Sequence, residues 1–216
     1  MALTGLFGGT FNPIHNGHLR AAEEVQHYLP LDRILFIPSY VPPHKDPTEV
    51  VPAWQRLRMV EIACQDHPGF VVSDLEVKNP GPSYSIITLR KLKELYPLDI
   101  FWFILGSDAF LEIETWKDYT QLLQECSLAI VKRPGSELEK LNKVIYKIKP
   151  GLVVKLNKRR KSEIKDSGRP GLYLIDIEAL DISSSEIRRR LRTGQPVTGL
   201  VPPGVENYIM ENHLYY

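Results

Sequence analysis

Residues 8–18, with the sequence GGTFNPIHNGH, combine two imidazoles with small residues and a turn-forming proline. An apolar run precedes this segment and a helical pattern follows it, so it lies where a strand would end and a helix begin. The free N–H groups and positive dipole end of such a helix attract anions. His15 and His18 are three residues apart, so a helix starting near Asn16 would let both rings reach one phosphate. Gly17 between them leaves room for a ligand near the backbone.

Two other interpretations of this segment stay open. Gly8 and Gly9 alone would also suit an ordinary turn. The histidines could be a metal pair, but a structural zinc site needs about four ligands, and the only further candidate nearby is His44. Because no cysteine or carboxylate cluster accompanies them, the sequence predicts no metal site built by the protein and favours phosphate binding.

Residues 182–188, with the sequence ISSSEIR, form a second candidate anion site. They follow an apolar run and open a helix expected to end near residue 192. A hydroxyl at the start with Glu186 one turn later is typical of helix capping. Three hydroxyls exceed what a cap needs, and with Arg188 they could surround a phosphate with O–H, N–H and guanidinium donors. The other arginines of this helix are interpreted as solvated surface: Arg189, Arg190 and Arg192.

Apolar runs and helical patterns alternate along the chain. Strands are predicted near residues 3–8, 33–38, 70–77, 99–105, 127–132 and 172–177. Helices are predicted near residues 17–29, 52–66, 84–96, 116–125 and 135–148. The alternation predicts an α/β fold, a Rossmann-like doubly wound and mainly parallel sheet with helices on both faces. We find no internal repeat or low-complexity linker, so residues 1–216 are predicted to form a single domain.

Composition excludes several classes of protein. The formal net charge is +1, so no global field favours nucleic acid or an acidic membrane as a partner. Cys64 and Cys126 are far apart and outside any C-x-x-C pattern, which argues against a disulfide framework. The first residues lack signal-peptide character, and the longest apolar run is too short to span a bilayer. We expect a cytoplasmic protein that binds neither nucleic acid nor membranes, and its oligomeric state stays open.

One segment is strongly basic. Residues 132–169 carry 13 Lys and Arg against 4 Asp and Glu. We interpret this segment as solvated surface, with an insertion around residues 157–171. Arg133 follows directly after an expected strand and could reach the phosphates of a nucleotide.

The segments GTFNPIHNGH and ISSSEIR resemble the H-x-G-H and I-S-S-T-x-I-R signatures of the nucleotidyltransferase superfamily. Within that superfamily the chain is similar, nearly end to end, to the bacterial nicotinate-nucleotide adenylyltransferase family. Further matching segments are PPHK at 42–45, PSYS at 82–85, GSD at 106–108, Trp116, KRP at 132–134 and positions between Val201 and Tyr215. Ser185 and Ser85 stand where the family often has threonine, and both keep the hydroxyl.

The resemblance implies transfer of the adenylyl group of ATP to nicotinate mononucleotide, giving deamido-NAD and pyrophosphate. Both substrates carry phosphates, so His15, His18 and Arg188 would act by neutralising charge, and Mg²⁺ would be bound mainly through the ATP phosphates. The resemblance places these residues at ATP: Gly8, Gly9, Thr10, Gly17, Gly106, Asp108, Ile182, Ser183, Ser184 and Ser185. It places these at the mononucleotide: Lys45, Tyr84, Ser85, Trp116 and Arg133.

In that assignment Tyr84 and Trp116 stack on the pyridine ring, and Asp108 binds the adenosine ribose. A pocket lined by hydrogen-bond donors would favour nicotinate, because a neutral amide leaves an anion site unmatched.

Three alternatives remain. A phosphopantetheine, FMN or cytidylyl transferase would share both phosphate signatures but not the residues on the acceptor side. An aminoacyl-tRNA synthetase would share the histidine motif, but this chain is short for an anticodon module and lacks a basic RNA-binding domain. A nucleotide-binding regulator would retain the fold without needing His15, His18 and Arg188.

Overall fold

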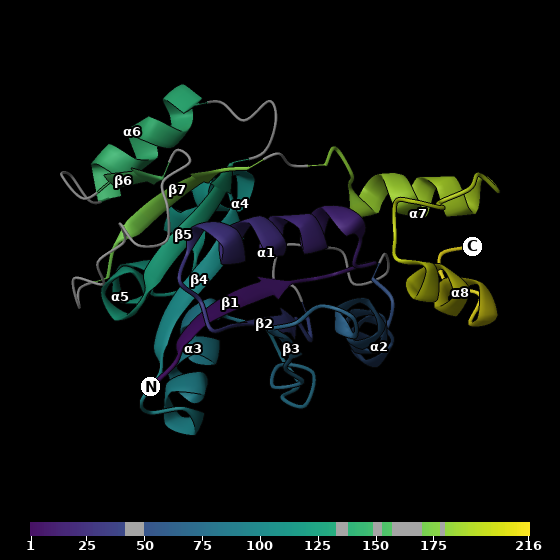
Figure 1. Ribbon diagram of the computed structural model, residues 1–216, viewed down its shortest axis with the longest axis horizontal. Helices are drawn as coiled ribbons and strands as arrows, with labels where there is room; N and C mark the ends of the chain where they lie inside the picture. Colours follow the sequence, from purple (N-terminus) through teal and green to yellow (C-terminus); the bar gives the residue numbers. More distant parts are fainter. Residues whose placement is uncertain (42–49, 133–137, 149–152, 157–169, 178–179) are drawn as a thin grey trace. The chain divides into compact units, whose positions relative to one another are not determined.

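Short apolar segments and amphipathic segments alternate in the chain and form strands and helices (Figure 1). The computed structural model describes residues 1–41, 50–132, 138–148, 153–156, 170–177 and 180–216. The strands are β1 (Leu3–Gly9), β2 (Arg33–Pro38), β3 (Phe70–Val72), β4 (Ile100–Gly106), β5 (Ser127–Lys132), β6 (Val153–Leu156) and β7 (Leu172–Asp176). The helices are α1 (Asn16–Tyr28), α2 (Ala53–Cys64), α3 (Ser85–Leu95), α4 (Ser107–Leu111), the 3-10 turn η2 (Ile113–Thr115), α5 (Tyr119–Glu125), α6 (Leu138–Ile148), α7 (Ser184–Arg192) and α8 (Pro203–Glu211).

The strands form a seven-stranded sheet in the order β3-β2-β1-β4-β5-β7-β6. Strand β1 pairs in parallel with β4, β4 with β5, and β7 with both β5 and β6. The order runs one way from β1 to β3 and the other way from β4 onward, which is the reversal that defines a doubly wound sheet. The predicted Rossmann-like α/β fold is therefore confirmed.

The chain divides into two compact units. Unit 1 comprises Met1–Phe7, Ala21–Ile34 and Tyr84–Ala179. Unit 2 comprises Gly8–Arg20, Leu35–Ser83 and Leu180–Tyr216. Both candidate phosphate motifs therefore belong to unit 2, although about 170 residues separate them in sequence. The predicted single domain over residues 1–216 stays a prediction.

Unit 1 is built around buried strand residues. Continuous apolar runs bury most of β4 and β5, as expected for parallel strands. Gly5 permits tight packing there, because a Cβ at this position would lie 2.9 Å from Cδ1 of Ile104. Trp102 contacts Tyr173 with ring centroids 4.3 Å apart. Helix α3 packs against α5, and α4 packs against α6.

Unit 2 is held together by helix packing. Helix α2 packs against both α8 and β3. Gly204 allows the close approach of α8, because a Cβ there would lie 2.7 Å from Cγ2 of Ile62. The Tyr208 hydroxyl donates to Oε1 of Gln55 at 2.6 Å and adds a polar link between the same helices.

Some element predictions were wrong in extent. The strand predicted over residues 70–77 ends at Val72, because a turn follows in which the Lys78 N–H donates to the Asp74 carbonyl at 2.9 Å. The helix predicted from residue 116 begins at Tyr119, after Asp118 adopts a left-handed φ of 49°. Elements β6 and α8 had not been predicted.

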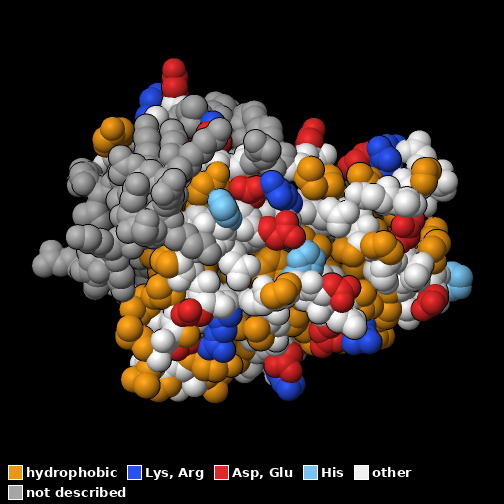
Figure 2. Space-filling model, viewed as in Figure 1, with side chains coloured by type: hydrophobic (Ala, Val, Ile, Leu, Met, Phe, Trp, Pro, Cys, Tyr) orange, Lys and Arg blue, Asp and Glu red, His pale blue; other side chains and the backbone are white. Residues whose placement is uncertain are grey.

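The visible surface in Figure 2 intersperses acidic, basic and hydrophobic side chains, in keeping with a formal net charge of +1. Among the described residues, no helix combines the length and apolar character that crossing a membrane would require.

Candidate functional site

Residues 10–15, which we name the phosphate loop, connect β1 to α1, which begins at Asn16 as predicted. The rings of His15 and His18 stack with centroids 3.6 Å apart and an interplanar angle of 29°. The backbone N–H of His15 donates to Nδ1 of His18 at 3.3 Å. A neutral His18 that accepts at Nδ1 carries its proton on Nε2, which suits that atom to donate to an oxyanion. The structure thus brings the two predicted histidines together.

Gly17 makes the close approach of these groups sterically allowed. A Cβ at residue 17 would lie 3.0 Å from Nδ1 of His15 and 3.5 Å from Cβ of Ile182. The first motif and Ile182 of the second therefore meet at the first turn of α1. Gly9 has a similar role, because a Cβ there would lie 2.9 Å from Cζ of Phe11.

The second motif forms the start of α7, where Ser183 is the N-cap. Its Oγ accepts from the Glu186 N–H at 3.2 Å, so the predicted capping is confirmed. The Ser184 hydroxyl donates to the Pro13 carbonyl at 2.9 Å. These bonds assign two of the three hydroxyls to structure. The N–H groups of the first helical turn, which have no partner within the helix, remain suited to phosphate oxygens.

Arg188 connects the second motif to the phosphate loop. Its Nη1 donates to the Asn12 carbonyl at 3.0 Å, and its Nη2 donates to Oγ of Ser185 at 3.4 Å. Together with the bond between Ser184 and Pro13, this contact joins two motifs that are far apart in sequence. Arg188 is half-buried and lies beside the phosphate loop, which carries His15 and leads into α1 with His18.

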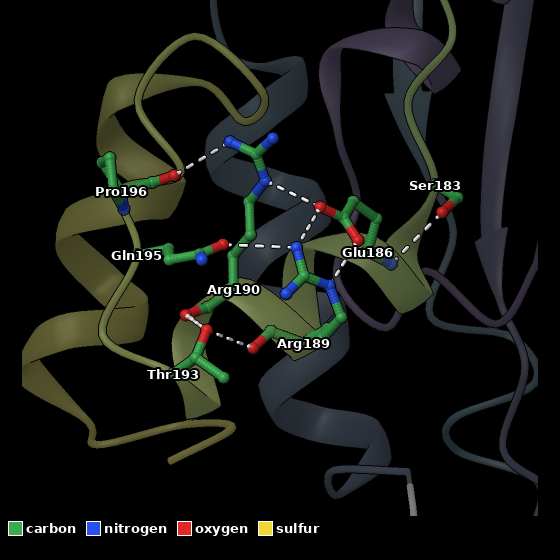
Figure 3. Close-up of polar contacts among 7 residues, drawn as sticks. All are labelled: Ser183, Glu186, Arg189, Arg190, Thr193, Gln195 and Pro196. Atoms are coloured by element: carbon green, nitrogen blue, oxygen red, sulfur yellow. Dashed lines mark hydrogen bonds and ion pairs between the residues drawn. The ribbon is translucent and has the colours of Figure 1, made fainter.

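Two other arginines of α7, Arg189 and Arg190, are paired differently (Figure 3). Arg189 donates from Nε and Nη2 to the two carboxylate oxygens of Glu186 at 2.8 and 2.7 Å, and Arg190 Nε donates to Oε1 at 2.9 Å. Hydrogen bonds from Arg189 and then Arg190 lower the pKa of Glu186 to about 2. Figure 3 also shows Arg189 reaching Gln195 and Arg190 reaching the Pro196 carbonyl. These contacts agree with the interpretation of this face as surface.

Sequence reasoning missed Arg56, a fully buried residue of α2. Its Nη1 donates to the Thr10 carbonyl at 2.6 Å, and its Nε donates to the Val51 carbonyl at 3.0 Å. Its Nη2 donates to the carbonyls of Ser39 at 2.6 Å and Tyr40 at 3.0 Å. Burial lowers the pKa of Arg56 to about 10, so the guanidinium stays charged at neutral pH. This cation fixes the start of the phosphate loop to the segment that leaves β2.

A signal for Arg56 does exist in the sequence. Arg56 shares the buried face of α2 with Met59 and Val60 at helical spacing. A charged residue on the apolar face of a predicted helix requires a compensating set of hydrogen bonds, and that requirement could have identified it.

The residues proposed for the adenosine and pyridine sides lie in unit 1. Tyr84 is the N-cap of α3, and Ser85 is the first residue of that helix. Lys117, which the sequence analysis did not select, places its Nζ 4.8 Å from the centroid of the Tyr84 ring. Trp116 precedes it and contacts Phe103 edge-on at 6.1 Å. The structure therefore brings the segments of Tyr84 and Trp116 together and adds a cation beside them.

Gly106 ends β4 as the N-cap of α4, and Asp108 lies exposed in the first turn of that helix. Gly8 and Thr10 lie half-buried at the end of β1 and the start of the phosphate loop. Lys45 and Arg133 lie outside the described residues, as does most of the basic segment 132–169.

Comparison with known proteins gives consistent results. A family model described as cytidylyltransferase-like matches residues 6–190. A Geobacter metallireducens protein named probable nicotinate-nucleotide adenylyltransferase is 44% identical over 213 residues, covering 98% of this chain and 97% of the relative. A Geotalea daltonii protein of the same name is 43% identical over 212 residues, with the same coverage. The solved structure of Plasmodium falciparum nicotinic acid mononucleotide adenylyltransferase complexed with NaAD has a TM-score of 0.73 at 22% identity, over 100% of this chain and 98% of that one.

Proposed function

Since the chain belongs to the cytidylyltransferase-like family and, within it, to the nicotinate-nucleotide adenylyltransferases, we propose that it transfers the adenylyl group of ATP to nicotinate mononucleotide. The products are deamido-NAD and pyrophosphate. One observation carries the proposal beyond family membership: the stacked histidines and the start of α7 are joined through the phosphate loop by the bonds of Ser184 and Arg188. This joins imidazole, guanidinium and helix N–H donors, which together suit a triphosphate.

The chemistry needs charge neutralisation rather than proton transfer. A phosphate oxygen of the mononucleotide forms a bond to the α-phosphorus of ATP, and the bond from that phosphorus to the pyrophosphate oxygen breaks. Nucleophile and leaving group are already anionic, so no general base is required. Catalysis then depends on alignment and on donors fixed before the transition state forms.

We assign the donors as follows. His18, the more exposed of the two histidines, donates from Nε2 to the α-phosphate as its charge reorganises. His15 lies buried beneath it and supports its ring. Arg188 and the first N–H groups of α7 hold the β- and γ-phosphates. Backbone groups at the remaining glycine-rich positions pack around the nucleotide: Gly8, Gly9, Thr10, Gly17 and Ile182.

Mg²⁺ would enter the site as part of the nucleotide substrate. Within the described ranges, no three His, Cys, Asp or Glu side chains cluster so as to hold a metal ion. Mg²⁺ retains several waters and is commonly bound through substrate phosphates, so the donor set described above is compatible with a magnesium–ATP complex.

The acceptor assignment follows the resemblance. Tyr84 and Trp116 would face the pyridine ring, while the first N–H groups of α3, beginning at Ser85, would hold its carboxylate. Lys45 and Arg133 would contact the mononucleotide, and Gly106 with Asp108 would hold the adenosine ribose. The cation of Lys117 beside Tyr84 supports preference for a negatively charged pyridine substituent.

We further propose that the enzyme acts in the cytoplasm. Cys64 is buried and free, as expected in a compartment that keeps thiols reduced.

Pyrophosphate release tests the proposal. ATP and Mg²⁺ are supplied with nicotinate mononucleotide, nicotinamide mononucleotide, FMN and phosphopantetheine in parallel. We expect release with nicotinate mononucleotide to exceed that with the nicotinamide form. Pyrophosphate release with only another acceptor would refute the acceptor assignment but leave the assignment of the ATP site in place. No release with any of the four acceptors would favour a nucleotide-binding regulator.

A further inference from the structure

Tyr215, in the segment after α8, contacts the phosphate loop directly. Its hydroxyl donates to Oδ1 of Asn12 at 2.9 Å, and its side chain is only 9% exposed. The same Oδ1 accepts from the Val51 N–H at 3.2 Å, and Asn12 is 2% exposed. A loop residue with so little access to water depends on these donors, because a buried amide oxygen without them would be costly.

The backbone carbonyl of Asn12 is a second acceptor, and it holds Arg188. The Asn12 carbonyl accepts from Nη1 of Arg188 at 3.0 Å. One loop residue thus receives Tyr215 at its side chain and Arg188 at its backbone. A displacement of Asn12 therefore also displaces the group on which the Arg188 guanidinium rests.

The backbone on both sides of this contact is unusual. Tyr215 has a φ of 71°, and Phe11, immediately before Asn12, has a φ of 46°. Residues other than glycine rarely adopt this left-handed backbone conformation. They keep it only when surrounding contacts determine the conformation. Burial also raises the pKa of Tyr215, although the charges of Arg56 and Arg188 oppose this effect, so the hydroxyl keeps its proton and donates.

We propose that Tyr215 is a positioning residue of the ATP site, whose bond to Asn12 fixes the carbonyl that holds Arg188 in place for the nucleotide phosphates. Tyr215 itself contacts no substrate in this scheme. The inference rests on the proposed function, because that function assigns Arg188 to the β- and γ-phosphates. It adds a chain segment that neither signature motif contains.

Tyr215→Phe removes the hydroxyl and retains the buried ring. We expect kcat/KM for ATP to fall about 3- to 10-fold, the loss typical of one buried hydrogen bond, while KM for nicotinate mononucleotide stays within about twofold. The matched control is Tyr208→Phe, which removes a hydroxyl of the same unit that bonds to Gln55 instead of the loop. Equal effects of the two variants on kcat/KM for ATP would overturn the proposal.

A double-mutant cycle separates positioning from general destabilisation. If Tyr215 acts through Arg188, adding Tyr215→Phe to Arg188→Ala should change the affinity for an ATP analogue with a methylene bridge by less than about twofold. An undiminished effect in that background would contradict the mechanism. Should Tyr215→Phe fail to fold, Asn12→Ala removes the same acceptor and keeps the carbonyl that Arg188 contacts, and it should weaken analogue binding similarly.

Analogue binding also separates the two proposals. Wild-type protein that binds the analogue without releasing pyrophosphate from nicotinate mononucleotide would refute the proposed function alone. The role of Tyr215 would then still be decided by the ratio of analogue affinities between wild type and Tyr215→Phe, with Tyr208→Phe as reference.

Discussion

Contacts with two neighbours, His15 and Phe11, hold the imidazole of His18. His15 stacks on one face, the His15 N–H donates to Nδ1, and Phe11 meets the ring edge-on with centroids 5.1 Å apart. Because the ring is already fixed, it needs little reorganisation when charge develops on a bound phosphate. On the proposed function, this pair is therefore prepared for electrostatic catalysis.

Replacing His18 with alanine should therefore remove catalysis more than binding. We expect His18→Ala to lower kcat by about 10²–10⁴ while KM for nicotinate mononucleotide changes little. Steady-state pyrophosphate release measures both constants. His27→Ala, an exposed position at the other end of α1, serves as the control. Turnover of His18→Ala equal to that of the control would remove His18 from the mechanism.

The sequence could predict some site residues and not others, depending on what each residue binds. His15, His18 and Arg188 stand in short motifs whose residue types already indicate phosphate chemistry, and the structure brings them into one unit. Arg56 and Tyr215 gave no such signal. Arg56 binds backbone carbonyls, which every residue possesses, and Tyr215 depends on a partner 203 residues away.

At the scale of elements, α2 acts as a support for the loops that surround the site. Through Arg56 it binds carbonyls at Thr10, Ser39, Tyr40 and Val51, which belong to two of the three stretches that make up unit 2. Removing one partner of a buried charged network leaves several acceptors unpaired and costs far more than breaking a surface pair.

Arg56→Met should thus destabilise the fold by about 2–5 kcal/mol. Arg58→Met offers a matched control on the same helix, because Arg58 is exposed and forms an ion pair with the exposed Glu61 at 2.9 Å. Loss of this surface pair should lower the free energy of unfolding by less than about 1 kcal/mol. Urea unfolding followed by circular dichroism measures both. Coincident urea midpoints for the two variants would show that the carbonyl contacts contribute nothing to stability.

Element predictions succeeded where hydrophobic patterning was long and failed where local contacts decided. Strand β2 spans the predicted residues 33–38, and β5 spans 127–132. Helix α8 was missed although Val205 and Ile209 lie one turn apart on its buried side. Strand β6, with four residues, is too short to give a clear periodic signal.

For the molecule as a whole, the family predicted from the motifs and the nearly end-to-end resemblance was confirmed, and so was the fold predicted from the alternation of strand and helix patterns. The buried thiol of Cys64 sets a separate limit on its stability. Burial raises the pKa of Cys64 from 9.0 to about 12. The unfolded thiol therefore loses its proton near pH 9, while the folded thiol keeps it.

The sign of this linkage gives a testable alkaline limit. The contribution of Cys64 is fully present below about pH 9 and is lost as pH rises toward 12. We expect the urea midpoint of the wild type to fall as the pH rises above about 9, and the fall to be shallower in Cys64→Ala. Urea unfolding curves collected across this pH range test the prediction. An equal fall of the urea midpoint with pH in the two proteins would contradict it.

The bonds that complete the phosphate loop also have a consequence for biosynthesis. Ser184 follows its partner Pro13 by 171 residues along the chain. Arg188 and Tyr215 follow their common partner Asn12 by 176 and 203 residues. At a translation rate of about 5–20 residues per second, the last partner emerges roughly 10–40 s after the histidines. On the proposed function, a nascent chain therefore carries both imidazoles long before the site for the triphosphate is complete, and ATP can stabilise the folding protein through this site only after Tyr215 has emerged.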